Sequence, residues 1–284
     1  MSFRIVADSC CDKTEIINKF DNITFVPLTL SIGDYVIPDD ENFDQDDFVG
    51  RMIASSETAK TACPSPDAWA TAYDCDEDDV YVITITDKLS GTYNSALQGK
   101  TLFEEEHGEK KNIHVFNSLA TAGIESLVAE RIHKLASDGV PFEQVVEDVE
   151  DLIVNRSKLF FCLESLDVLK NNGRLFALAT GLLKKLRVRL ILHACDGNIK
   201  LSGQELSMNR ALTKMASFIG EDVKDSDLSD KRLIITHVCC PERAQFVAEK
   251  ISAYAKFGSV EIVKASGLNT VYMSNGGIIA AYTK

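Results

Sequence analysis

The first half of the chain alternates short apolar runs with longer segments of helical periodicity. Runs typical of buried strands occupy residues 3–7, 80–85 and 113–116, and a further strand region with a turn at Gly33-Asp34 covers 23–30 and 35–37. Helical patterns lie between them, from residue 9 toward Phe20, over 43–54, from Ser65-Pro66, over 92–106 and over 118–137. Strands that alternate with helices predict a parallel sheet covered on both faces.

The pattern changes after Pro141. Asp196-Gly197 predicts a hairpin turn between a strand at 188–194 and a strand at 199–201, and therefore antiparallel pairing. The remaining expected elements are helices to about 154, within 163–186, over 209–219 and over 241–257, and strands at 159–162, 233–237, 260–263 and 277–282. We therefore predict a two-domain α/β protein, with a parallel-sheet domain over residues 1–155 and a mixed-sheet domain over 156–284.

Charge and composition exclude several kinds of partner. The 284 residues are 45% hydrophobic, and 30 basic against 43 acidic residues give a net charge of -13, which disfavours binding to nucleic acid or to anionic lipid surfaces. No run approaches the roughly 18 apolar residues of a membrane span. The first residues do not resemble a signal peptide. We expect a cytoplasmic protein with reduced thiols, no membrane insertion and, most simply, a monomer.

Motifs for common cofactors and catalytic sites are missing. The eight cysteines contain no C-x-x-C pair, and the acidic run at 74–79 has Asp79 and Ile85 where a calcium loop needs Gly and Glu. No phosphate-binding glycine motif or G-x-S-x-G elbow occurs. The sequence therefore predicts no metal site, no cofactor and no catalytic residues.

Two turns rich in hydroxyl groups open predicted helices. They are Thr61-Ala-Cys-Pro-Ser-Pro66 and Asp87-Lys-Leu-Ser-Gly-Thr-Tyr-Asn-Ser-Ala96. Free backbone N–H groups and the positive end of the helix dipole favour an anion there, so Thr61, Ser90 and the Gly91 N–H are candidate ligands for a carboxylate or phosphate. Ordinary helix capping is the alternative for each turn alone.

Positive charges gather between two distant acids, Asp167 and Asp196. The six basic residues of this basic island are Lys170, Arg174, Lys184, Lys185, Arg187 and Arg189. Such an island either docks an acidic partner, guards an anionic headgroup, or is a solvated helix face.

Several motifs occur in a set order along the chain. They are Ala7-Asp-Ser-Cys-Cys-Asp12, Thr61 to Pro66, Leu89 to Ala96, Asn117-Ser-Leu with Ala122-Gly123, Leu169-Lys-Asn-Asn-Gly-Arg174, and Asp196-Gly197. Together they resemble the DegV family over essentially the whole chain. The resemblance implies two α/β domains that enclose a long-chain fatty acid in a tunnel. It also implies a carrier that is not itself an enzyme, similar to the fatty-acid-binding subunit that presents the carboxylate to a separate bacterial fatty acid kinase.

The resemblance also implies roles for individual residues. Thr61 and Ser90 correspond to the carboxylate-binding hydroxyls, with Gly91 as an N–H donor, and Arg174, with Lys184 and Lys185, to a headgroup or partner surface. The family's His-x-Gly-Pro-Gly motif is here Tyr272-Met-Ser-Asn-Gly276, so Tyr272 and Ser274 are expected at the headgroup in place of the histidine and glycine. A phenol donates a hydrogen bond but carries no positive charge, which weakens the expectation of kinase coupling more than that of lipid binding.

Two other functions compete with this interpretation. A phosphotransfer protein would use His237 or His193 as the phosphate acceptor, by analogy with related α/β architectures. A plain interaction protein would bind an acidic partner through the basic island and hold no ligand.

Overall fold

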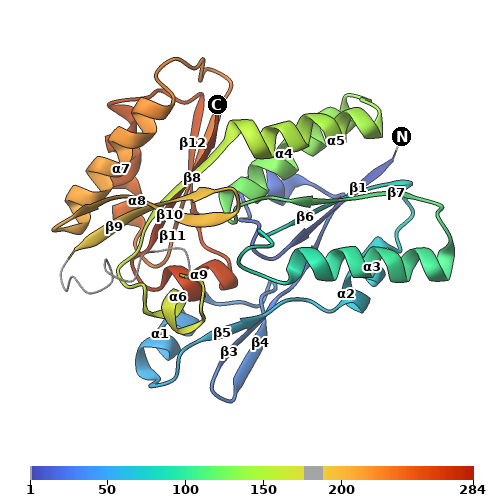
Figure 1. Ribbon diagram of the computed structural model, residues 1–284, viewed down its shortest axis with the longest axis horizontal. Coiled ribbons are helices and arrows are strands. Elements are labelled where there is room, and N and C mark those ends of the chain that lie inside the picture. The colour runs from blue at the N-terminus through green and yellow to red at the C-terminus, as the bar shows by residue number, and fades with distance from the viewer. Residues whose placement is uncertain (1, 176–187) are drawn as a thin grey trace.

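The computed structural model describes residues 2–175 and 188–284 (Figure 1). Its N-terminal sheet contains β1 (Phe3–Asp8), β2 (Ile23–Val26), β6 (Asp79–Thr84) and β7 (Asn112–Asn117), all parallel, in the order β2-β1-β6-β7. Helices α2 (Pro66–Tyr73) and α3 (Thr92–His107) pack on one face, and α4 (Gly123–Ser137) and α5 (Phe142–Asp151) on the other. The predicted parallel, doubly covered sheet is therefore confirmed.

The C-terminal sheet is mixed, as predicted. Its described strands run in the order β10-β9-β8-β13-β11-β12, and among them only β11 and β12 pair in parallel. The strands are β8 (Ser157–Cys162), β9 (Arg189–Cys195), β10 (Asn198–Glu205), β11 (Arg232–His237), β12 (Ser259–Lys264) and β13 (Ile278–Thr283). Helices α7 (Met208–Asp222) and α8 (Pro241–Ser252) cover its outer face. The domain boundary near residue 155 stays a prediction.

Helix α4 lies between the two sheets and packs against strands of both (Figure 1). Gly123, in its first turn, has no room for a side chain, since a Cβ atom there would lie 2.9 Å from Ala281 Cβ and 3.0 Å from Ile234 Cβ. Both neighbours belong to the C-terminal sheet, so this glycine lets the helix approach that sheet closely. One continuous apolar core therefore joins the two sheets through α4.

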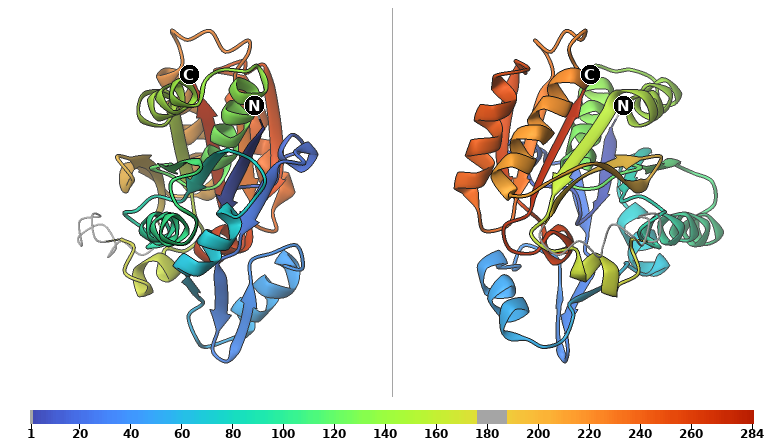
Figure 2. Two further views of the ribbon diagram at one scale, coloured as in Figure 1. Left: turned by 90° about the vertical axis from the view of Figure 1, so that its right-hand side faces the viewer. Right: turned by 60° about the vertical axis from the view of Figure 1, so that its left-hand side comes forward.

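A small lobe projects from the rest of the molecule (Figure 2). It consists of the antiparallel strands β3 (Thr29–Ile32), β4 (Tyr35–Pro38) and β5 (Lys60–Ala62), with helix α1 (Gln45–Ala54). The single strand predicted at 23–30 was wrong. Pro27 has no N–H to continue a ladder, and the chain leaves the parallel sheet there to enter the lobe.

Other departures from the predicted elements are local. The helix predicted from residue 9 is only the short 3-10 turn η1 (Ile17–Lys19), and α4 starts five residues later than predicted, after a loop at 118–122. α5 continues as a π turn, η2 (Leu152–Arg156), and the short helices α6 (Asp167–Asn171) and α9 (Gly267–Met273) frame the site described below. Among the described residues, none of the helices has the length and apolarity needed to cross a membrane.

Candidate functional site

A cavity of about 80 Å³ lies where the carboxyl ends of β6 and β7 meet the C-terminal sheet and α9. Its wall is mostly apolar and includes Leu159, Phe161, Ala194, Ile199, Met273 and Ile279. Its polar groups include Thr61, Thr86, Ser90, Thr121, Asn269 and Tyr272. The cavity therefore combines an apolar wall with a small set of hydroxyl and amide groups and one guanidinium, that of Arg174.

Close packing of α2 against α3 brings the two hydroxyl-rich turns together. Ser95 Oγ donates a hydrogen bond of 2.6 Å to the Pro64 carbonyl, which ties the first turn to the helix that follows the second. A Cβ atom on Gly99 would lie 2.5 Å from Trp69 Cβ and 2.7 Å from the Pro66 carbonyl oxygen, so only glycine permits this helix spacing. The turns meet because the helices that they open are in contact.

The sequence predicts Thr61 in a turn, but in the structure it belongs to strand β5. Strand β5 pairs with β3, and this places the half-buried Thr61 side chain at the cavity. Its hydroxyl lies 3.1 Å from the phenol oxygen of Tyr272 on α9, within hydrogen-bond distance. Two of the predicted ligand residues therefore contact each other directly.

Ser90 stands directly before α3, whose N-cap is Gly91. The Ser90 hydroxyl lies 2.8 Å from the Thr92 hydroxyl and also accepts a hydrogen bond from the Thr92 N–H at 3.3 Å. Ser90 lines the cavity, whereas Gly91 is exposed and does not line it. A Cβ atom on Gly91 would lie 3.4 Å from Cys63 Sγ, so this glycine sits between the two turns.

The residues predicted for the partner or headgroup surface have different outcomes. Arg174 lines the cavity, and its guanidinium donates to the carbonyls of Leu89, at 3.2 Å, and Asn172. Arg174 therefore holds the segment that carries Ser90. Lys184 and Lys185, together with Arg187, lie outside the described residues.

Ser274 does not line the cavity. It follows α9 in a left-handed backbone conformation, with φ at +55°. The expected contribution of this residue to the headgroup therefore has no support in the geometry.

The sequence does not indicate four polar residues of the cavity, Thr86, Thr121, Asn198 and Asn269. Thr86 Oγ1 donates to the Gly197 carbonyl at 3.1 Å, and Thr121 Oγ1 donates to Asn269 Oδ1 at 2.9 Å. Thr86 and Thr121 lie just after β6 and β7, so strand ends were the available signal for two of them. Asn269 lies in α9, which the sequence did not predict as a helix.

The position of α9 depends on the buried Asp39. Its carboxylate accepts hydrogen bonds from the Gly267 and Leu268 N–H groups, at 2.7 and 2.8 Å, and from the Ser9 hydroxyl at 2.9 Å. Burial raises the Asp39 pKa to about 6, although these donors act in the opposite direction. One carboxylate thus connects the lobe to the helix that carries Tyr272.

Neither histidine of the phosphotransfer alternative lines the cavity. His237 is buried, its Nδ1 accepts the Cys240 N–H at 3.3 Å, and burial lowers its pKa. His193 lies on β9 beside the Ser202 hydroxyl, at 2.7 Å, and burial lowers its pKa as well. Both imidazoles are fixed by neighbours away from the candidate site.

Comparison with known sequences gives matches along the whole chain. A profile of the DegV family, described as uncharacterised proteins, matches residues 2–282. A DegV domain-containing protein of Streptococcus pneumoniae is 32% identical over 285 residues, which cover 99% of each chain.

Solved structures give the same picture. A DegV family protein from Ruminococcus gnavus, refined with vaccenic acid, has a TM-score of 0.94 and 37% identity and covers 99% of each chain. The Streptococcus pneumoniae Fatty Acid Kinase (Fak) B3 protein, loaded with linoleic acid, has a TM-score of 0.87 and 31% identity over 100% of this chain and 99% of that one. A protein from Eubacterium eligens loaded with heptadecanoic acid has a TM-score of 0.88 and 28% identity, with full coverage of both.

Proposed function

The chain belongs to the DegV family, and from this we propose that it binds one long-chain fatty acid in the cavity between its two sheets. The observation that carries the proposal is the cavity itself, whose lining is mostly apolar and includes Thr61, Ser90 and Tyr272. Relatives that are 37% and 31% identical hold vaccenic and linoleic acid. The protein then acts as a lipid carrier and not as an enzyme by itself.

The carboxylate would accept hydrogen bonds from Thr61, Ser90 and Tyr272, with the Gly91 N–H as a further donor at the rim. Neutral donors suit this task because they hold an anion without a buried counter-charge. The Thr61 and Tyr272 hydroxyls already face each other at 3.1 Å, so a carboxylate oxygen would replace or share that contact.

The tail would lie against the apolar wall formed by β8, β9, α9 and β13. Burial of each CH₂ contributes roughly 0.8 kcal/mol, so most of the affinity comes from the tail and the orientation from the headgroup. The cavity volume of about 80 Å³ is below the roughly 300–1,000 Å³ of usual small-molecule pockets. The wall therefore has to open when a long tail enters.

We further propose that the carrier presents the carboxylate to a separate fatty acid kinase for acyl phosphate formation. Arg174, at the cavity, would contact the headgroup or the kinase, and Lys184 and Lys185 would dock it. The protein would do this as a monomer in the bacterial cytoplasm, with no cofactor. The phosphohistidine alternative is not favoured.

Native mass spectrometry tests lipid binding directly. Delipidated protein is incubated with oleic acid and separately with methyl oleate, which has the same tail without the carboxylate. We expect one retained molecule of the acid per chain and much weaker retention of the ester. Failure to retain either one contradicts the proposal, and equal retention of both contradicts the assignment of the headgroup site.

Kinase coupling needs a second assay. The loaded carrier is mixed with a fatty acid kinase catalytic subunit and ATP, and acyl phosphate is trapped with hydroxylamine. We expect Arg174→Ala to lose most of the product but to retain most of its lipid, because the tail supplies most of the affinity. Product from unloaded carrier, or none from loaded wild-type protein, contradicts the presentation step but leaves lipid binding intact.

A further inference from the structure

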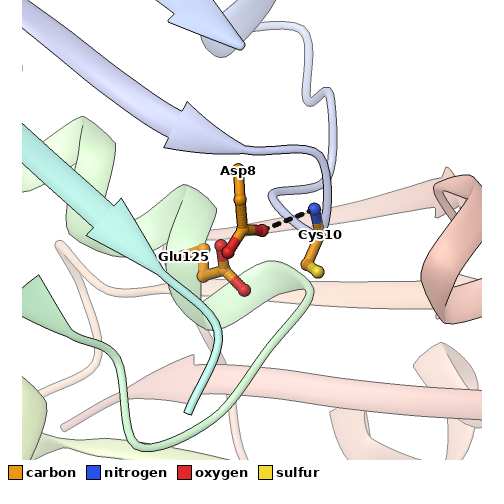
Figure 3. Close-up of side chains that lie close together, drawn as sticks. All are labelled: Asp8, Cys10 and Glu125. Carbon is orange, nitrogen blue, oxygen red and sulfur yellow. Dashed lines mark hydrogen bonds between the residues drawn. The ribbon is translucent and has the colours of Figure 1, made fainter. Parts of the chain in front are cut away.

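Three side chains that can ligate a metal converge in the core (Figure 3). Asp8 ends β1, Cys10 follows in the next turn, and Glu125 lies in the first turn of α4. Their ligand atoms, two carboxylate oxygens and the thiol sulfur, lie within 4.8 Å of one another, and all three residues have 0% of their surface exposed. We propose that Asp8, Cys10 and Glu125 bind a zinc ion.

The surroundings of the buried Glu125 carboxylate favour a cation beside it. Both Glu125 carboxylate oxygens are buried, and neither has a partner in hydrogen-bond geometry among the described residues. The nearby Thr121 hydroxyl donates to Asn269 instead. A buried carboxylate without a donor is rare in folded proteins, because its desolvation then goes uncompensated. Figure 3 shows this carboxylate directed at Asp8 and Cys10, so the neutralising species belongs between these groups.

Among the residues that the structure describes, the ionisable groups beside the cluster supply no positive charge. Asp12 and Asp39 face the cluster and are themselves acidic. Asp8 accepts the Cys10 N–H at 2.8 Å on one oxygen and the Ile85 N–H at 2.7 Å on the other. Each oxygen keeps a lone pair for a further partner.

The donor set favours zinc over the common hard cations. Ca²⁺ and Mg²⁺ select oxygen ligands, whereas Zn²⁺ accepts cysteine sulfur together with carboxylate oxygen. Zinc–ligand bonds of about 2.0–2.3 Å bring ligands closer together than 4.8 Å, so binding requires small side-chain rotations. Water or a second carboxylate oxygen would complete four-fold coordination.

A zinc ion here would support the floor of the cavity. It would link the turn after β1 to α4, and Asp8 would connect it to Ile85, which lines the cavity. The inference does not depend on the fatty acid, because the three ligands do not line the cavity.

A single shared proton is the competing arrangement. A protonated Glu125 would donate to Asp8, and burial does raise the pKa of Glu125 well above its usual range. In that arrangement the Cys10 thiol is a second hydrogen-bond donor to Asp8, whereas in the zinc site all three groups are ligands. The two arrangements differ in metal content, so an experiment separates them.

The test begins with the zinc content of the full-length protein, purified without chelator and also refolded with Zn²⁺, by plasma mass spectrometry. We expect about one zinc per chain, a fall of at least tenfold in Glu125→Gln, and no change in the control Cys11→Ser. Zinc far below one per chain in both preparations overturns the proposal.

Cobalt gives a readout on wild-type protein itself, which does not require any variant to fold. Protein refolded with Co²⁺ should show a sulfur-to-cobalt charge-transfer band in the near ultraviolet. The band should be absent in Cys10→Ser and present in Cys11→Ser. If wild-type protein lacks the band, or shows an infrared carbonyl band of a protonated carboxyl group that Glu125→Gln removes, the shared proton is correct and the zinc site is not.

Discussion

Thr61 Oγ1 and the phenol oxygen of Tyr272 lie 3.1 Å apart, although 211 residues separate them in the sequence. Thr61 is held by β5 of the lobe and Tyr272 by α9. Pairing with β3 fixes β5, and hydrogen bonds from its first N–H groups to Asp39 fix α9. The two hydroxyls are therefore in place before any ligand arrives. Donors that are already oriented lose less entropy when they bind an anion.

Removal of two hydroxyls should weaken carboxylate binding. Hydrogen bonds to a charged group contribute about 1.5–3 kcal/mol each, so we expect Thr61→Val with Ser90→Ala to raise the Kd for oleic acid by at least about 100-fold. Titration calorimetry with delipidated protein measures the change.

Thr101→Val is the matched control, because Thr101 is exposed on α3 and away from the cavity. Its Kd should equal that of wild-type protein. If the double variant also binds methyl oleate more weakly than wild-type protein does, a collapsed wall and not the lost donors explains the effect.

Replacement of Tyr272 by histidine should introduce a pH dependence. An imidazole with a pKa near its ordinary value of about 6.5 is charged at pH 5.5 and neutral at pH 8. We therefore expect Tyr272→His to bind oleic acid several-fold more tightly at the lower pH, relative to wild-type protein at each pH. An equal pH profile for both proteins would place Tyr272 away from the carboxylate.

The contact between α2 and α3 predicts opposite effects for two glycine substitutions. Gly99→Ala forces a Cβ atom against Trp69 and the Pro66 carbonyl and should destabilise the fold by about 1–3 kcal/mol. Gly50→Ala in α1 meets nothing within 4 Å and should stabilise it by about 0.5–1 kcal/mol. Denaturant titrations measure both, and equal stability of Gly99→Ala and wild-type protein would argue against close packing of the two turns.

The raised pKa of Asp39 predicts how the free energy of unfolding changes with pH. The folded-state pKa of about 6 lies above the ordinary value of 3.8, so protonation favours the folded state. The stabilising effect of that proton is complete below about pH 4 and is lost as the pH rises through about 6. It amounts to at most about 3 kcal/mol.

Comparison with Asp39→Asn isolates this titration. The free energy of unfolding of wild-type protein minus that of the variant should increase as the pH falls from 7 to 4. Loss of an acceptor for the α9 N–H groups adds only an offset that does not change with pH. A difference that decreases toward acid would mean that the three donors dominate and hold the Asp39 pKa below its ordinary value.

Much of the fold could be predicted because its signals are local. Ser65 and Pro66 start α2 as predicted, with the Ser65 hydroxyl accepting the Ala68 N–H at 3.3 Å. The Asp196-Gly197 turn joins β9 to β10 in the expected antiparallel pair. In each case the residues that determine the structure are neighbours in the chain.

The parts that were missed depend on distant residues. Helix α9 has seven residues, and its first N–H groups are satisfied by Asp39, more than 220 residues away. Strand β5 has three residues and exists because β3 pairs with it. Glu125 reads as an ordinary acid near a helix start. No sequence motif indicates that it lies beside Asp8 and Cys10 in the fold.

Strand β13 is the last element of the chain, yet it lies in the middle of the C-terminal sheet, and with α9 it completes the cavity wall. A chain truncated before residue 267 has neither the Tyr272 phenol nor this central strand. Under the proposed function, such a truncated chain would lose one donor for the carboxylate and part of the wall for the tail together. Headgroup binding and tail binding therefore depend on the same late segment of the sequence.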